Sequence, residues 1–173
     1  RHSLAMRILT LVRHAKSSWD YPELSDFERP LNERGRRDAP MMAQRAKDNP
    51  PLPERLVASP ALRAITTARA FAEVLGTDTD EIVVQPKIYD ASLAALMRVV
   101  RGLDDGDRHV MLFGHNPGFS QLAHELARCT FDELPTCAVA RIELDIKLWA
   151  DVTPGCGLLT RYSYPKEGAP KRA

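Results

Sequence analysis

The stretch RILTLVRHAKSSW, residues 7–19, contains a short apolar run that ends on two side chains of a different kind. The residues from Ile8 to Val12 are aliphatic or β-branched, which is typical of a strand buried on both faces. The run stops at Arg13 and His14, whose side chains are costly to bury unless a partner satisfies them. The stretch therefore predicts a central strand that delivers an arginine and a histidine to one edge of a sheet.

Strand-like and helix-like segments alternate along the rest of the chain. We expect strands at about 7–13, 55–59, 81–85, 109–113, 137–148 and 157–164, and helices at 33–47, 60–76, 92–103 and 117–128. Without repeats or linker-like stretches, this pattern predicts a single α/β domain over residues 6–165 with a mixed, mostly parallel sheet. Residues 1–5 precede Met6 and are expected to be an expression remnant, and residues 166–173 a disordered tail.

Composition narrows the class of protein. The 173 residues carry a net charge of +1, which argues against a general electrostatic partner such as nucleic acid or a membrane surface. No apolar run approaches the roughly 20 residues that span a bilayer. The three cysteines, Cys129, Cys137 and Cys156, have no CxxC spacing. We interpret them as reduced thiols of a soluble cytoplasmic protein without a zinc site or a disulfide framework.

Three predicted strands end on polar side chains at the carboxyl edge of the sheet, where ligands bind in such folds. Arg13 and His14 end the first strand, Ser59 ends the second with Arg63 shortly after it, and His115 follows the fourth. Parallel strands bring such residues to one edge. Together these side chains predict an anion site that contains two imidazoles.

The expected starts of two helices give further support to an anion site. Ser59 and Asn116 are expected to be N-caps, with Pro60 and Pro117 at the first helical positions. Arg63 would then lie in the first turn, where the helix dipole disfavours a cation. An anion between the arginine and the helix end would remove this conflict. Pairing of Arg63 with a surface carboxylate is the alternative.

Other histidines do not share this pattern. The dipeptide Arg108-His109 precedes its strand and so belongs to the opposite, amino edge of the sheet. His124 lies in the middle of a predicted helix and is expected to be structural.

These residues resemble the histidine phosphatase superfamily, whose members have the phosphoglycerate mutase-like fold. The motifs that carry the resemblance appear in the family's order as VRHA (12–15), SPALRA (59–64) and FGH (113–115). Three further stretches resemble the small SixA-type phosphohistidine phosphatases: RHAKSSW (13–19), RPLNERG (29–35) and GHNPG (114–118). The resemblance implies a three-layer α/β/α fold and a phosphatase that needs neither a metal nor another cofactor.

The resemblance also implies roles for four residues. His14 would attack phosphorus and form a phosphohistidine intermediate that water hydrolyses. Arg13, Arg63 and His115 would bind the phosphoryl oxygens. To attack, His14 must be neutral, and we expect the neighbouring arginines to lower its pKa below the usual value of about 6.5.

Several positions depart from the family's pattern. Ala15 replaces the usual glycine, and Asp20 stands where larger members have an asparagine that contacts phosphate. Because a carboxylate would repel phosphate, Lys16 and Ser17 are the alternative donors, unless they belong to a solvated loop. Asp90 is the positional match for the glutamate that protonates the leaving group in larger relatives, although it could equally cap a helix.

Three functions remain open from the sequence. The leading one is removal of phosphate from a phosphohistidine-containing protein of the phosphotransfer or phosphorelay type, by a monomer with an open pocket. A small-molecule phosphomonoesterase or phosphoglycerate-type mutase is the second, but the short interval between Arg63 and His115 leaves no room for the cap of a mutase. The third is a catalytically silent protein that binds a phosphorylated ligand.

Overall fold

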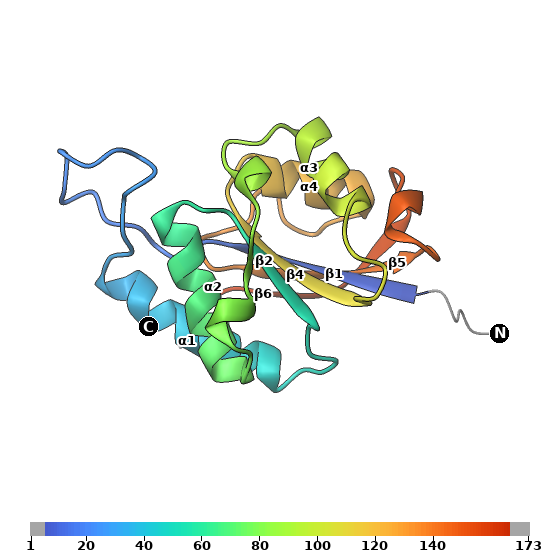
Figure 1. Cartoon of the computed structure of the whole chain (residues 1–173), viewed down its shortest axis with the longest axis horizontal. Coiled ribbons are helices and arrows are strands. Elements are labelled where there is room, and N and C mark those ends of the chain that lie inside the picture. The colour runs from blue at the N-terminus through green and yellow to red at the C-terminus, as the bar shows by residue number, and fades with distance from the viewer. Residues whose placement is uncertain (1–5, 167–173) are drawn as a thin grey trace, which may run out of the picture.

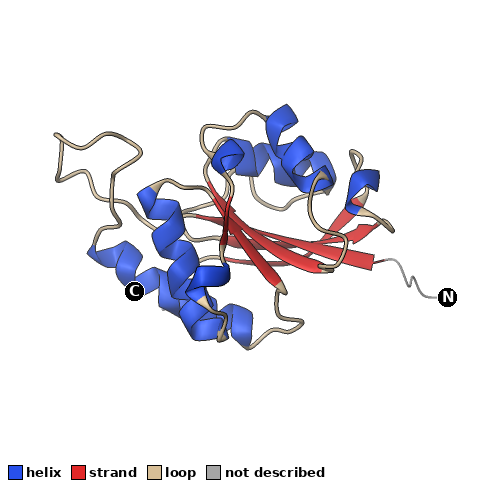
Figure 2. Ribbon diagram, viewed as in Figure 1, coloured by secondary structure: helices blue, strands red, loops and turns tan. Residues whose placement is uncertain are grey.

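A six-stranded sheet lies between two layers of helices, with α1 and α2 on one face and α3 and α4 on the other (Figures 1 and 2). The strand order is β3-β2-β4-β1-β5-β6, and β5 alone runs against the others. The expected three-layer α/β/α class with a mostly parallel sheet is therefore confirmed. The computed structural model describes residues 6–166, so the expectations for residues 1–5 and for the tail beyond Lys166 lie outside the described residues.

The strands and helices follow the predicted order. The strands are β1 (Met6–Arg13), β2 (Arg55–Ala58), β3 (Val83–Val84), β4 (His109–Gly114), β5 (Val139–Asp145) and β6 (Gly157–Ser163). The α-helices are α1 (Glu33–Lys47), α2 (Leu62–Leu75), α3 (Leu93–Arg101) and α4 (Gly118–Leu126). No helix within residues 6–166 combines the length and apolar character needed to cross a bilayer.

The pairing of β1 explains how distant residues meet. In the parallel β1–β4 ladder Arg13 lies opposite Gly114, so His14 and His115 both follow at the same edge. In the β2–β4 ladder Ala58 lies opposite Phe113, which brings Ser59 and the start of α2 to that edge as well. The register of three neighbouring strands thus builds the site.

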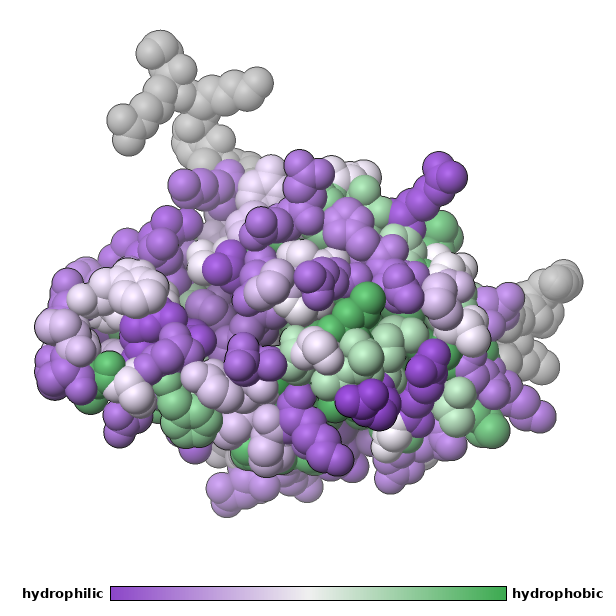
Figure 3. Space-filling view, turned by 90° about the horizontal axis from the view of Figure 1, so that it is seen from above, coloured by the Kyte–Doolittle hydropathy of each residue, from purple (hydrophilic) through white to green (hydrophobic). Residues whose placement is uncertain are grey.

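The sheet separates two apolar cores. One packs under α3 and α4 and includes Leu9, Phe119 and Trp149, and the other packs under α1 and α2 and includes Met42 and Phe71. All five side chains are fully buried. Charged and polar residues cover most of the outer surface in Figure 3. The central strand β1 contacts both cores, as its unbroken apolar run predicts.

The predicted helix starts are wrong in detail. Helix α2 begins at Leu62 with Ala61 as its N-cap residue, and α4 begins at Gly118 after Pro117. Ser59 does not cap α2, because its hydroxyl accepts from the Ala61 amide at 3.2 Å and lies 2.7 Å from Nε2 of His115. The Asn116 side chain instead donates to the Leu134 carbonyl at 2.8 Å. The Ser59 side chain thus contacts His115, and the Asn116 side chain contacts the loop that contains Leu134.

The first turn of helix α1 contains a glycine, Gly35, that has no room for a side chain. Asn32 caps this helix by accepting from the Gly35 amide at 2.8 Å. A Cβ added to Gly35 would overlap the carbonyl oxygen of Lys16, in the loop that follows β1. We expect Gly35→Ala to lower the free energy of unfolding by about 1–3 kcal/mol, the usual cost of overpacking. Urea denaturation measures this, with Glu33→Ala in the same turn as the control. Equal stability of the two variants would contradict the steric argument.

Candidate active site

The three strand ends converge on a pocket of about 360 Å³. The structure brings all four predicted residues to its wall, since Arg13, His14, Arg63 and His115 all line it. The two imidazole rings are 5.3 Å apart between centroids and inclined by 52°. The four side chains are thus in place to contact one bound group.

His14 is fixed with one ring nitrogen available. Its Nδ1 lies 2.7 Å from the carbonyl oxygen of Ala15, and since a carbonyl only accepts, Nδ1 must carry the proton. Nε2 therefore holds the lone pair that a nucleophile needs. Burial, more than the charges of Arg13 and Arg63, lowers the pKa of His14 to about 3. The expected direction of the shift is confirmed, whereas desolvation and not the arginines is its largest cause.

His115 is held from two sides. Its Nε2 lies 2.7 Å from the Ser59 hydroxyl, and the edge of its ring meets Tyr89 at 5.6 Å between centroids. Burial, followed by the charge of Arg63, lowers its pKa to about 4. Its Nδ1 is buried without a hydrogen-bond partner.

The pKa values of these two rings can be checked directly. Because burial disfavours the charged imidazole, we expect His14 and His115 to stay neutral as the pH falls from 8 to about 5. Protonation should begin only near pH 4 and below. Ring resonances in NMR spectra should therefore stay constant between pH 5.5 and 8, and His14→Gln and His115→Gln variants assign them. A His14 midpoint near 6.5 would contradict the described burial.

Arg63 is occupied by a carboxylate that the sequence did not point to. Its Nη2 lies 3.0 Å from Oδ2 of Asp26, and its Nη1 donates to the Asp26 backbone carbonyl at 2.6 Å. The Tyr89 hydroxyl donates to the same carboxylate at 2.6 Å. This bond first, and then the contacts to Arg29 and Arg63, hold the pKa of Asp26 below its ordinary value. The alternative that Arg63 pairs with a surface carboxylate is therefore correct for this structure, and that carboxylate lines the pocket.

Arg29 adds another cation to the pocket. Its Nη2 forms an ion pair with Asp26 at 3.0 Å, and its Nη1 donates to the Ser17 hydroxyl. The guanidinium stacks over the Trp19 ring with its central carbon 4.0 Å from the ring centroid. Arg29 belongs to the RPLNERG motif, whose resemblance to SixA-type proteins was the only sequence signal for this residue.

The charge of the pocket matches a dianion. Four cationic side chains (Arg13, Lys16, Arg29, Arg63) and two anionic ones (Asp26, Asp90) line it, which leaves a net charge of +2 when both histidines are neutral. Among the described residues, five buried side-chain nitrogens lack a hydrogen-bond partner, and four of them belong to residues of this pocket. They are Nε of Arg13, Arg29 and Arg63 and Nδ1 of His115. The Nε–H groups of the three arginines are uncompensated buried donors, which are costly, and a bound phosphoryl group would offset the positive charge of these guanidiniums.

The remaining predicted residues are placed differently. Lys16 and Ser17 both line the pocket, although the Ser17 hydroxyl already accepts from Arg29. Asp20 lies outside the pocket, in a neighbouring groove. Asp90 is exposed on the pocket wall and does not cap α3, whose N-cap is Ser92. Within residues 6–166, no group of three or more His, Cys, Asp or Glu side chains is arranged to hold a metal.

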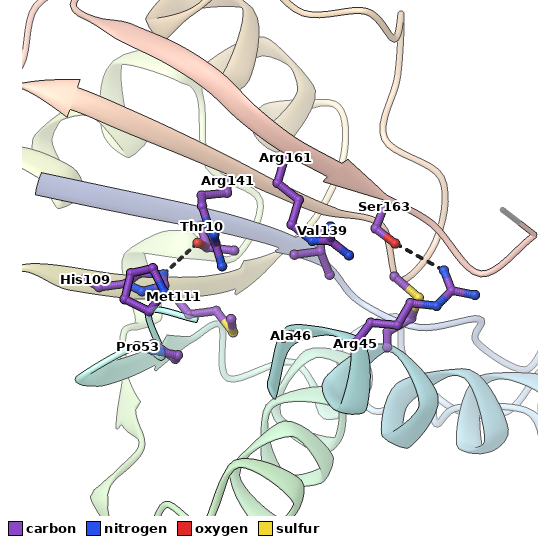
Figure 4. Close-up of a pocket in the computed structure, with 12 residues that line it drawn as sticks. Thr10, Arg45, Ala46, Pro53, His109, Met111, Val139, Arg141, Arg161 and Ser163 are labelled. Atoms are coloured by element: carbon purple, nitrogen blue, oxygen red, sulfur yellow. Dashed lines mark hydrogen bonds between the residues drawn. The ribbon is translucent and has the colours of Figure 1, made fainter. Parts of the chain in front are cut away.

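A second pocket lies between the sheet and α1, away from this edge (Figure 4). Its interior volume of about 10 Å³ suffices for one water molecule. There Nε2 of His109 lies 2.7 Å from the Thr10 hydroxyl, and Arg45 donates to Ser163 at 3.1 Å. His109 begins β4 at the amino edge and is 4% exposed. The Arg108-His109 dipeptide therefore lies at the amino edge, as predicted, and His109 does not line the pocket at the carboxyl edge.

Comparison with known proteins agrees with this geometry. The model of the histidine phosphatase superfamily (branch 1) matches residues 9–98. An uncharacterized chloroplastic protein of Arabidopsis thaliana is 31% identical over 155 residues, which cover 84% of this chain and 70% of that protein. The solved SixA protein of Agrobacterium tumefaciens is 25% identical, with a TM-score of 0.75 and coverage of 92% of this chain and 98% of that one. The protein histidine phosphatase SixA solved with tungstate is 24% identical, with a TM-score of 0.77 and coverage of 91% and 97%.

Proposed function

Because this chain belongs to the histidine phosphatase superfamily, we propose that it removes phosphate from phosphohistidine on a protein, with His14 as the nucleophile. Membership of the superfamily supports phosphatase activity. The observation that carries the proposal is the state of His14: a neutral imidazole, with Nδ1 bound to Ala15 and Nε2 available, in a pocket of net charge +2. The similar fold of a protein histidine phosphatase supports the substrate class.

The proposed reaction has two steps. In the first, the Nε2 lone pair of His14 forms a bond to phosphorus while the bond from phosphorus to the substrate nitrogen breaks. That nitrogen takes the bonding pair, and the substrate leaves as a histidine with a neutral imidazole. In the second, the oxygen of water forms a bond to phosphorus while the bond from phosphorus to Nε2 breaks, inorganic phosphate is released with the water protons shared between it and solvent, and His14 recovers its lone pair. Arg13, Arg63 and His115 would stabilise the charge on the phosphoryl oxygens throughout, and Arg29 adds a fourth group to this set.

The leaving group decides between substrates. The Asp26 carboxylate has a lowered pKa and so is a poor proton donor, and Asp90, the positional candidate for the acid, lies exposed on the pocket wall. An alkoxide leaving group needs protonation, whereas an imidazole leaves with little help because the phosphoramidate bond is more labile than an ester. This favours phosphohistidine over a phosphomonoester.

A comparison of substrates tests the proposal. We expect kcat/KM for a phosphohistidine protein to exceed the values for sugar phosphates and phosphoglycerate by at least about tenfold, which corresponds to 1.4 kcal/mol of transition-state stabilisation. Aryl phosphates should fall between, in the order of leaving-group pKa. A sugar phosphate or phosphoglycerate that proves the best substrate by tenfold would indicate a small-molecule phosphatase. Binding of phosphate without turnover of any substrate would indicate a silent binding protein.

A further inference from the structure

A loop between β1 and α1 forms one wall of the pocket and then projects from the body of the protein (Figure 1). We call residues 17–31 the rim loop. Its base is closed by a bridge between Ser17 and Leu31 and by a hydrogen bond from the Ser18 amide to the Pro30 carbonyl at 2.8 Å. Loops of this size with adjoining ends are compact surface structures that often carry function.

The rim loop exposes large apolar side chains to solvent. Its exposed members are Trp19 (75% exposed), Tyr21 (51%), Leu24 (36%) and Phe27 (42%). Leu62 extends this patch, since its amide donates to the Phe27 carbonyl at 3.0 Å. The patch thus contains five of the eleven large apolar side chains that are exposed in the described part of the chain. Such a concentration on one surface is typical of a site of interaction.

The patch is anchored to the pocket. Asp26, between Leu24 and Phe27, contacts Arg63 and Tyr89, and the Phe27 ring meets the Tyr89 ring edge-on at 5.2 Å. Trp19 and Asp26 also line the pocket themselves. A surface that covers the patch would therefore also lie over the opening that leads to His14.

The charge of the rim loop indicates the kind of partner. Besides Asp26 it carries three acidic residues, Asp20, Glu23 and Glu28, all exposed. Its one basic residue, Arg29, is engaged with Ser17, Trp19 and Asp26 on the pocket side. The outer face is therefore apolar and acidic, and it complements a surface on which apolar side chains are bordered by lysine and arginine.

We propose that the rim loop is the docking surface for the phosphorylated protein substrate. The partner would be a folded protein that presents its phosphohistidine from a convex surface, with apolar residues beside it and basic residues around them. This inference rests on the proposed function and adds how the substrate is selected. Tyr21 and Leu24 do not line the pocket, so a small phosphorylated molecule can enter it without contacting them. Only a protein substrate is large enough to gain binding energy from the patch.

The test compares a protein and a small substrate in the same variants. The probes are a phosphotransfer domain phosphorylated on its histidine, and phosphoramidate itself. Tyr21→Ser/Leu24→Ser should raise KM for the phosphorylated domain by about tenfold or more and leave kcat/KM for phosphoramidate within about twofold of the wild type. The matched control is Leu148→Ser/Leu158→Ser, which removes two side chains of similar exposure (44% and 67%) near the end of β5 and the start of β6, at the amino edge of β1 and opposite the edge that holds the pocket. It should change neither value.

Three outcomes would overturn the docking proposal. The first is an unchanged KM for the domain in the rim-loop variant, and the second is an equal loss in the control. The third is a dimer that sedimentation detects in the wild type and not in the rim-loop variant, while KM for the phosphorylated domain stays the same. That result would make the patch a surface for self-association. Failure of the proposed function is separate, since the wild type would then not hydrolyse the phosphorylated domain, whatever its rate with phosphoramidate.

Discussion

The His14→Ala variant is expected to lose turnover by at least about 10⁴-fold, as enzymes do when the attacking group itself is removed. The side chain supplies the neutral imidazole nitrogen, Nε2, that the proposed first step uses. Arg13, Arg63 and His115 would remain and could still bind phosphate. The loss should therefore fall on kcat. Quenching in alkali, which preserves the acid-labile bond of phosphohistidine, should trap phosphorylated enzyme in the wild type and none in the variant.

The control separates chemistry from folding. His14 lies just beyond the end of β1, and the one hydrogen bond that its ring makes is to the neighbouring Ala15 carbonyl. The variant should consequently keep its circular dichroism spectrum and a cooperative thermal transition. His124→Ala, in the middle of α4 and exposed, should retain full activity. A phosphoenzyme that still forms in His14→Ala would assign the nucleophile to another residue.

The position of the four predicted residues could be inferred from the sequence because a simple rule governs it. Parallel strands that are each followed by a helix end at the same edge of the sheet. Approximate strand boundaries were therefore enough to predict that Arg13, His14 and His115 lie together at that edge. The register Arg13–Gly114 then places the two histidines together. The predicted starts of α2 and α4 were wrong by two residues and one residue. These errors did not change the predicted site, because the strand ends and not the helix caps determine which residues lie at the edge.

Asp26 and Tyr89 could not be predicted in the same way. They are 63 residues apart in sequence, and each belongs to a loop whose path no periodicity describes. The conflict between Arg63 and the helix dipole indicated an anion beside the arginine, and a surface carboxylate was the alternative, but the sequence did not identify Asp26 as that carboxylate. Local sequence propensity predicts where helices and strands form. It does not predict which residues of two irregular loops come into contact, because that depends on the folded structure as a whole.

Arg63→Ala should reduce kcat/KM by about 10³-fold, the scale on which arginines stabilise a transferring phosphoryl group. Two effects add in this variant. The pocket loses a buried cation that is 6% exposed, and Asp26 loses one of the three side chains that bind its carboxylate. The carboxylate, freed from Arg63 but still bound by Arg29 and Tyr89, would then repel the incoming dianion more strongly. Steady-state kinetics measure the loss, and Arg37→Ala on the exposed face of α1 is the matched control.

The double variant Arg63→Ala/Asp26→Asn distinguishes the two effects, because the amide keeps the shape of Asp26 and removes its charge. If repulsion by the freed carboxylate contributes, the double variant should recover about tenfold in kcat/KM over Arg63→Ala, mainly through a lower KM. The rest of the loss belongs to the missing guanidinium and should persist in kcat. A double variant no better than Arg63→Ala would show that Asp26 does not oppose the substrate. In that case the carboxylate serves only to orient Arg63, and Asp26→Asn alone should then reduce kcat in a protein that still contains the arginine.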